Sequence, residues 1–306
     1  MAGLIFRRLL QLPLILAVVF AVTFTLVWVL PGNPLERAEG QRPPPEVEQA
    51  IKARYNLDSP ASFLIGYAKG ALVGDFGPSL EYRGRTVNEI IGEGLPISAS
   101  LGAAALGVAV FLGTLAGVLG ALKPGSALDN TSLLVALLGI SLPSFVTGTV
   151  LLVIFAGVLR WVPVGGWSSP VDMILPAVTL GLAPAAYIAR LIRLGLADIM
   201  SSDYLRTARA KGLSHTKALF KHALKVAYLP VLSFLGPAAA SVMTGSFVVE
   251  KVFNIPGIGE YFVNSVLNKD QSLILGIVLV YATMLIVFNL VVDVAYAWLD
   301  PRIELS

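Results

Sequence analysis

Six apolar runs, each long enough to cross a bilayer, constrain what this chain can fold into more than any other feature. A transmembrane helix needs about 20 consecutive apolar residues, because the hydrocarbon core is about 30 Å thick. Charged residues make up only 13% of the chain, against about 25% in a soluble domain. We therefore expect an all-α membrane protein with six transmembrane helices. The expected spans are 9–30, 97–122, 131–159, 173–196, 226–249 and 272–299.

The first apolar run could be mistaken for a secretory signal, because Arg7 and Arg8 precede it. A signal peptide has an apolar stretch of about 7–15 residues followed by a small-residue cleavage site. The run over 9–30 is longer, and no such site follows it. We expect it to remain as an uncleaved first span.

Composition also limits the chemistry of the chain. It contains no cysteine, which excludes disulfides and thiolate metal sites. Its two histidines, His215 and His222, fall in one basic segment, which disfavours a histidine metal site. The net charge of +3 is too small to suggest a nucleic-acid partner. The chain has no G-x-x-x-x-G-K-[ST] phosphate loop, so we expect no bound cofactor and no ATP hydrolysis by this chain.

The distribution of charge predicts the orientation of the chain in the membrane. Segments 1–8, 123–130, 190–225 and 300–306 hold 12 Lys and Arg against 5 acids. The segments on the opposite side hold 10 basic residues against 13 acids. Because cytoplasmic loops are enriched in Lys and Arg, both termini should be cytoplasmic.

The region between the first two spans is the largest polar piece. We divide the chain into the first span with its N-terminal end (1–30), an extracytoplasmic loop region (31–94), a membrane core (95–299) and a cytoplasmic tail (300–306). The prolines at 43–45 predict a short helix that ends near Asn56. Helical spacing predicts a second helix, which either lies on the outer membrane surface or packs on the spans. Its apolar residues are Phe63, Leu64, Tyr67, Ala68, Ala71 and Leu72.

A basic segment, residues 201–230, lies within the predicted cytoplasmic loop 197–225 and runs into the fifth span. Ser202 as N-cap and Asp203 in the first turn predict a helix that reaches Lys211. Gly212 should end this helix in a left-handed conformation, with Leu213 packing back on the helix end. Ser214 should cap a second helix.

The second helix of the basic segment has two predicted stripes. Residues Lys217, Lys221 and Lys225 recur every four residues and form a cationic stripe. An apolar stripe beside it contains Leu219, Ala223 and Val226. Two helices that meet at a glycine suggest a docking surface. The alternative is a basic loop that only orients the protein in the bilayer.

Several residues at membrane depth are candidates for a hinge or a pathway. Pro143 should free a backbone carbonyl within the third span, and Ser141 or Ser144 could bond it instead. Ser241 and Thr244 place hydroxyls in the fifth span. The alternative is that these residues only shape the helices.

A GxxxG pair, Gly113 and Gly117, predicts close helix packing in the second span, within the chain or at a subunit contact. Asp293 is the one acid in a predicted span, and a carboxylate at membrane depth is costly. It could contact a proton or substrate. We favour a structural ion pair with Arg190 or Arg193.

The basic segment resembles a known motif. The run from Tyr204 to Gly212 is similar to the EAA loop of ABC-importer permeases, with Arg206, Thr207 and Ala208 at the EAA positions. The Leu-Pro pair that ends the general motif is absent, and Leu224-Lys225 stands there. The run 222–225 is instead similar to the His-Ala-Leu-basic run of the peptide-permease branch.

The resemblance extends over nearly the whole chain to the B-type permeases of the oligopeptide, dipeptide and nickel importers. Further similar runs, in the same order as in that family, are Leu30–Pro34, Gly74–Ser79, Ser141–Phe145, Pro163–Trp167, Glu250–Phe253, Pro256–Gly259 and Leu299–Arg302. Asn33 stands where the family has Asp.

This resemblance implies a type I ABC importer permease in a bacterial or archaeal cytoplasmic membrane. A related C-type permease would complete the pore, two cytosolic ATPases carrying ATP-Mg would drive it, and an extracytoplasmic binding protein would deliver the solute. Loop 201–217 would couple to the ATPases. Its expected contact residues are Asp203, Tyr204, Arg206, Thr207, Ala208, Lys211, Gly212 and His215.

The resemblance makes peptides the default substrate. Nickel chelates, glutathione and oligosaccharides remain open. The rival function is a secondary carrier that uses Asp293 for protons.

Overall fold

The computed structural model describes residues 2–29, 44–55, 57, 59–122, 125–127, 129, 134, 139 and 141–299. The Leu30–Pro34 run, most of 131–140 and the tail 300–306 lie outside the described residues. The described chain is helical, and its only bridge between extended segments joins Pro78 and Thr86. The prediction of an all-α protein is confirmed.

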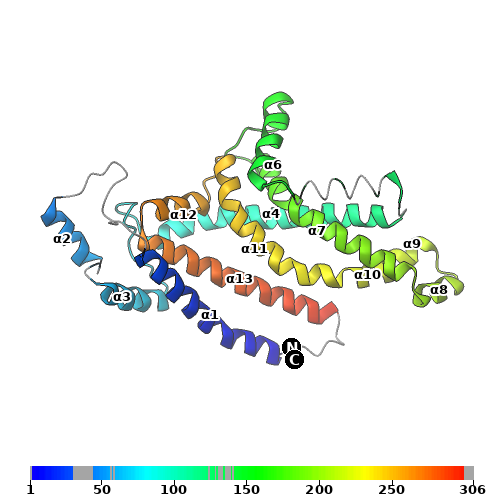
Figure 1. Ribbon diagram of the computed structural model, residues 1–306, viewed down its shortest axis with the longest axis horizontal. Coiled ribbons are helices and arrows are strands. Elements are labelled where there is room, and N and C mark those ends of the chain that lie inside the picture. The colour runs from blue at the N-terminus through cyan, green and yellow to red at the C-terminus, as the bar shows by residue number, and fades with distance from the viewer. Residues whose placement is uncertain are drawn as a thin grey trace. The chain divides into compact units, whose positions relative to one another are not determined.

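The helices follow one another along the chain as Figure 1 shows. Their bounds are α1 Ala2–Val29, α2 Pro45–Arg54, α3 Pro60–Leu72, α4 Val87–Leu122, α6 Ser144–Leu151, α7 Ile174–Met200, α8 Asp203–Ala210, α9 His215–Ala218, α10 Leu224–Ala227, α11 Leu229–Val252, α12 Ile258–Leu267 and α13 Gln271–Leu299. Two stretches are π-helical, Leu152–Val158 and Leu219–Ala223, and Pro170–Met173 is a 3-10 helix.

Helices long and apolar enough to span a membrane occur at Leu10–Val29, Val87–Leu122, Pro170–Met200 and Gln271–Ala295. Two further helices, Thr216–Ala227 and Leu229–Met243, are bent by 49° and pass the same test only when they are taken together; the second lies within the expected span 226–249. Pro230, at the start of α11, fits this bend because proline lacks the N–H that would continue the ladder. These helices correspond to five of the six expected spans. The remaining expectation, 131–159, falls partly outside the described residues, and its described end is the shorter apolar helix Ser144–Val158.

The third-span proline differs from the sequence expectation. Pro143 does not interrupt a helix; it stands immediately before α6, with φ −57° and ψ 142°. Its carbonyl accepts hydrogen bonds from the backbone N–H groups of Val146 and Thr147, at 3.0 and 3.2 Å. The ring therefore starts a helix, where a missing N–H has no cost.

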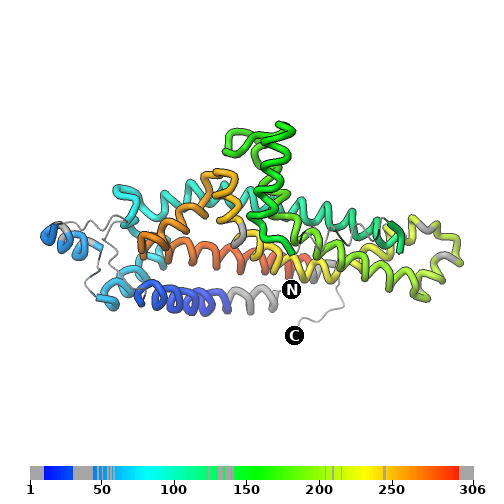
Figure 2. Tube along the Cα trace, turned by 45° about the horizontal axis from the view of Figure 1, so that its top comes forward, coloured from blue at the N-terminus to red at the C-terminus, as the bar shows by residue number. Residues whose placement is uncertain are grey.

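The chain divides into two compact units. One contains residues 2–98 and 256–287, and the other contains residues 99–255 and 288–306. The first unit has a core of stacked aromatic rings between α1 and α3. Phe24 lies 6.3 Å from Phe63, and Phe20 lies 5.9 Å from Tyr67, centroid to centroid. Leu275 of α13 packs in the same cluster. The second expected loop helix thus packs on a span, and Figure 2 shows α1 beside the first part of α13.

A buried carboxylate fixes the loop after α3 within this first unit. Asp270 precedes α13 and accepts hydrogen bonds from the hydroxyl of Ser79 and from the backbone N–H groups of Leu80, Glu81 and Leu273. Burial raises the pKa of Asp270, and the four donated hydrogen bonds oppose that rise. The carboxylate therefore caps α13 and anchors residues 79–81 at the same time.

The second unit is built around α7, whose side chains are the most buried of the apolar helices. The GxxxG pair of α4 faces it. A Cβ added at Gly113 would lie 2.6 Å from the carbonyl oxygen of Ala185, and one added at Gly117 would lie 2.7 Å from that of Ala189. Gly181 of α7 approaches Ala105 of α4 equally closely. The small residues thus serve helix packing within this chain.

Candidate functional site

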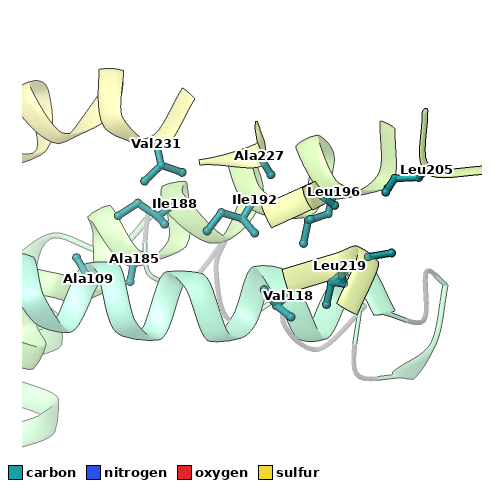
Figure 3. Close-up of a cluster of buried hydrophobic side chains, with 12 residues drawn as sticks. Ala109, Val118, Ala185, Ile188, Ile192, Leu196, Leu205, Leu219, Ala227 and Val231 are labelled. Atoms are coloured by element: carbon teal, nitrogen blue, oxygen red, sulfur yellow. The ribbon is translucent and has the colours of Figure 1, made fainter. Parts of the chain in front are cut away.

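The basic segment is attached to the second unit through an apolar core. Its buried side chains are Leu205, Ala218, Leu219, Ala223 and Ala227. They pack with Ile188, Ile192 and Leu196 of α7 and with Val118 of α4 (Figure 3). Only the two residues Ser201 and Ser202 separate α7 from α8. Residues of α7, α8 and α9 therefore share one close-packed core.

The turn between α8 and α9 has the predicted geometry. Gly212 has φ +89°, a left-handed conformation that a side chain would strain. Two hydrogen bonds close the end of α8, from Lys211 N–H to the Thr207 carbonyl (3.1 Å) and from Leu213 N–H to the Ala208 carbonyl (3.2 Å). Leu213 packs against the apolar core. Both predictions for this turn, the glycine conformation and the leucine contact, are confirmed.

The starts of the two short helices are formed differently. The hydroxyl of Ser214 accepts from Lys217 N–H at 3.4 Å, so it caps α9 as expected. Ser202 stands before α8, but its hydroxyl donates to the carbonyl of Ile199 at 2.6 Å. Its own carbonyl accepts from Leu205 and Arg206 N–H. Ser202 therefore ties the start of α8 to the end of α7.

A π-helical turn changes which residues of the second helix are buried. Leu219–Ala223 is π-helical, so this turn holds one more residue than an α-helical turn. The buried face therefore continues to Ala227, and Val226 is 46% exposed. The expectation of a Leu219, Ala223 and Val226 stripe is wrong at its last member, because it assumed regular 3.6-residue periodicity.

Most of the exposed side chains that the structure describes in the basic segment are polar or cationic, and one is an aromatic ring. Phe220 is 57% exposed, although its neighbour Leu219 is 2% exposed. Other exposed members are Asp203, Arg206, Thr207, Lys211, Lys217, Lys221 and Lys225. Ala208 is half-buried beside the core, and the side chains of Tyr204 and His215 lie outside the described part. Asp203 and Arg206 form an exposed pair at 3.2 Å, which contributes little to stability.

A charged clamp holds α7 shortly before the basic segment. Arg193 donates to both oxygens of Asp129, with its second bond, Nη2 to Oδ2, at 2.7 Å. Gly125 N–H also donates to Asp129 at 2.8 Å. The guanidinium of Arg193 and the Gly125 N–H together lower the pKa of Asp129. Arg193 thus pairs with Asp129, and the predicted ion pair of Asp293 with Arg190 or Arg193 stays a prediction.

Residues 109–305 match the family described as "Binding-protein-dependent transport system inner membrane component". The chain belongs to this permease family.

The relatives that match this permease over its full length are named as permeases of dipeptide and oligopeptide transport systems. It is 41% identical over 306 residues to the dipeptide transport system permease protein DppB of Bacillus subtilis, covering 100% of this chain and 99% of that one. It is 43% identical over 308 residues to the oligopeptide transport system permease protein OppB of Salmonella typhimurium, covering 99% and 100%. The predicted resemblance to ABC peptide-importer permeases is confirmed.

A solved structure supports the fold of the permease. A chain of the MetNI methionine ABC transporter, in an inward-facing conformation, matches with a TM-score of 0.53 at 17% identity. The match covers 69% of this chain and 96% of that one. This fold, together with the family match and the full-length relatives, makes the protein a type I ABC importer permease, a transport component and not an enzyme. None of these findings supports the proton-coupled carrier.

The predicted hinge residues of the permease lie on separate elements. Ser144 starts α6 and Ser241 lies exposed on α11, and α6 packs against both α7 and α11. The side chain of Thr244 lies outside the described part. Asp293 is half-buried on α13. Their roles as hinge or pathway residues stay predictions.

Sequence reasoning missed two kinds of residue in the permease. Asp129 and Asp270 each anchor a loop, but their partners are remote in sequence, so no local pattern marks them. Phe220 was overlooked because an aromatic residue beside Leu219 reads as core.

Proposed function

We propose that this permease imports peptides and that the basic segment is the surface on which a cytosolic ATPase acts. The observation that carries the proposal is that one side of this segment is buried and the other is exposed. One side is fixed in the core with α7, and the other presents Phe220 among exposed lysines. Binding hot spots favour an aromatic anchor, and rim charges steer the partner.

The basic segment is joined to α7 through a shared apolar core. Leu205, Leu219 and Leu196 lie in one core, so a force on α8 or α9 moves α7 with it. ATP binding on the ATPases would close them and displace the basic segment, and α7 would reorient the pore. Hydrolysis would reset the arrangement. The two sites are then coupled through one two-state element.

The assembly follows from the family. A related C-type permease would form the other half of the pore, and two ATPase subunits would bind ATP-Mg. An extracytoplasmic binding protein would deliver the peptide. Both termini and the basic segment would face the cytoplasm, as the excess of Lys and Arg there predicts. The membrane would be the cytoplasmic membrane of the cell, and its lipid would surround the exposed apolar helix faces.

The proposal is tested by reconstitution. Proteoliposomes containing the permease with its partner permease, its ATPases and the binding protein should take up labelled peptide only when ATP is inside. The control contains the permease alone under a proton gradient. Uptake by the permease alone would contradict the proposal, as would full transport without ATPases. A panel of peptides, a nickel chelate, glutathione and an oligosaccharide in the same vesicles defines the substrate.

A further inference from the structure

The first unit contains a small cavity between α3 and the loop that follows it. Its volume is about 140 Å³. Aromatic rings of Tyr55, Phe63, Tyr67 and Phe76 line it, together with the carboxylate-bearing Asp75. Pockets that bind drug-sized ligands measure about 300–1,000 Å³, so this cavity holds one side chain at most, or a few waters.

The lining is suited to a cation. Aromatic faces carry partial negative charge and attract ammonium and guanidinium groups. Asp75 adds a full negative charge, and the described residues that line the cavity include no basic side chain. Burial raises the pKa of the Tyr67 hydroxyl, and the nearby negative charges of Asp270 and Asp75 raise it further. These two charges also make the electrostatic potential at the cavity negative.

The charged wall is held rigidly. The Asp75 carboxylate accepts from Gly77 N–H at 2.9 Å, and the Asp75 N–H donates to the Gly70 carbonyl at 2.9 Å. The side chain of Asn88 binds the residues on either side of Asp75. It donates to the Gly74 carbonyl (2.6 Å) and accepts from Phe76 N–H (2.9 Å). The Tyr67 hydroxyl donates to the Ser272 carbonyl at 3.0 Å. A rigid, preformed wall lowers the entropy cost of binding.

We propose that this cavity receives one lysine side chain of the extracytoplasmic binding protein and so forms a docking point for it. The proposal rests on the proposed function and on the expected extracytoplasmic position of residues 31–94. The family description itself makes transport dependent on a binding protein. A lysine enters with an unbranched stem and one ammonium. The first residue of a peptide cargo brings a peptide group and a second substituent together with its ammonium, and it fits this volume less well.

The test measures binding of the cognate binding protein to the complete transporter in nanodiscs. Asp75→Asn removes the charge and keeps an acceptor for Gly77 N–H. Glu81→Gln is the matched control, because Glu81 is an exposed acid on the same loop and does not line the cavity. Asp75→Asn should weaken binding about tenfold, and Glu81→Gln should leave it unchanged. Tyr55→Leu, which removes one aromatic wall, should weaken binding several-fold and provides a second variant.

Chemical modification identifies the partner group. Acetylation of the binding protein's lysines removes their charge, whereas reductive methylation keeps it. Acetylation should weaken binding to the wild-type transporter and have a much smaller effect with Asp75→Asn, and methylation should preserve the difference between these transporters. Equal losses from acetylation in both transporters, or equal affinities of Asp75→Asn and Glu81→Gln, would overturn the proposal.

Two further outcomes separate the possible failures. If blocking the amino terminus of the peptide cargo abolishes the difference between wild type and Asp75→Asn in transport, the cavity binds cargo, and the docking proposal is wrong. If the binding protein stimulates the ATPase equally in wild type and Asp75→Asn, the docking proposal fails while the proposed function stands. If it stimulates neither transporter, the proposed function itself fails.

Discussion

Arg193 of α7 donates hydrogen bonds to both carboxylate oxygens of Asp129. Arg193 lies ten residues before Asp203, where α8 of the basic segment begins. This clamp joins the segment after α4 to α7, which leads into the basic segment. Asp129→Asn should lower the thermal midpoint of unfolding, because one partner of a bidentate charged pair is then neutral. Exchanging the two charges, Asp129→Arg with Arg193→Asp, should recover part of the loss. A midpoint equal to wild type in Asp129→Asn would show that the clamp is dispensable.

The same clamp predicts a pH dependence. The folded-state pKa of Asp129 is lowered below its unfolded value, so the ionised carboxylate contributes stability above the unfolded pKa of about 3.9. That contribution should disappear as the pH falls through the lower, folded pKa. The difference in stability between wild type and Asp129→Asn should therefore be constant near neutral pH and shrink in acid. A difference that grows in acid would contradict this account.

Gly212 should be required for coupling because of its backbone conformation. Gly212→Val should strain the turn by roughly 1 kcal/mol or more and lower substrate-stimulated ATPase activity and transport, with membrane insertion unchanged. Gly212→Asn is the matched control, because asparagine tolerates the left-handed region. It should retain most of the coupling. Wild-type coupling in Gly212→Val would show that the turn does not transmit the signal.

Leu219 and Phe220 are adjacent but should have different roles. Leu219→Ala should destabilise the protein by about 2–5 kcal/mol, because it removes buried methyl groups from the core. Phe220→Ala should change stability by less than about 0.5 kcal/mol, because the ring is exposed. It should instead weaken ATPase association by about tenfold or more. Thermal unfolding and ATPase binding in detergent measure the two effects, and the reverse pattern would refute the assignment of faces.

Two glycines of α4 give a direct test of helix packing. Gly113→Ala should destabilise the protein by about 1–3 kcal/mol, because the new methyl group would overlap the backbone of α7. A Cβ at Gly107 meets nothing within 4 Å. Gly107→Ala should therefore be neutral or stabilise by up to about 1 kcal/mol through helix propensity. Equal effects of the two substitutions would mean that α4 and α7 do not approach as described.

Local patterns predicted much of the fold. Apolar length located the spans, and the Gly212 turn followed from cap residues that act on their own neighbours. Pairings over long distances could not be predicted in this way, since nothing near Arg193 in sequence distinguishes Asp129 from Asp293 as its partner. The π-helical turn at 219–223 also escaped prediction, because its extra residue results from packing. Pro143 was assigned to a helix interior because the apolar run continues across it.

The most direct measurement of the central claim is site-specific cross-linking of the basic segment. The chain contains no cysteine, so single cysteines report unambiguously. In the assembled transporter, Lys211→Cys should cross-link to an ATPase subunit, with a yield that changes between nucleotide-free and ATP-bound states. Val73→Cys, exposed in the unit that contains α3, should not cross-link to the ATPase. ATPase cross-links from Val73→Cys, or none from Lys211→Cys in either state, would contradict the account.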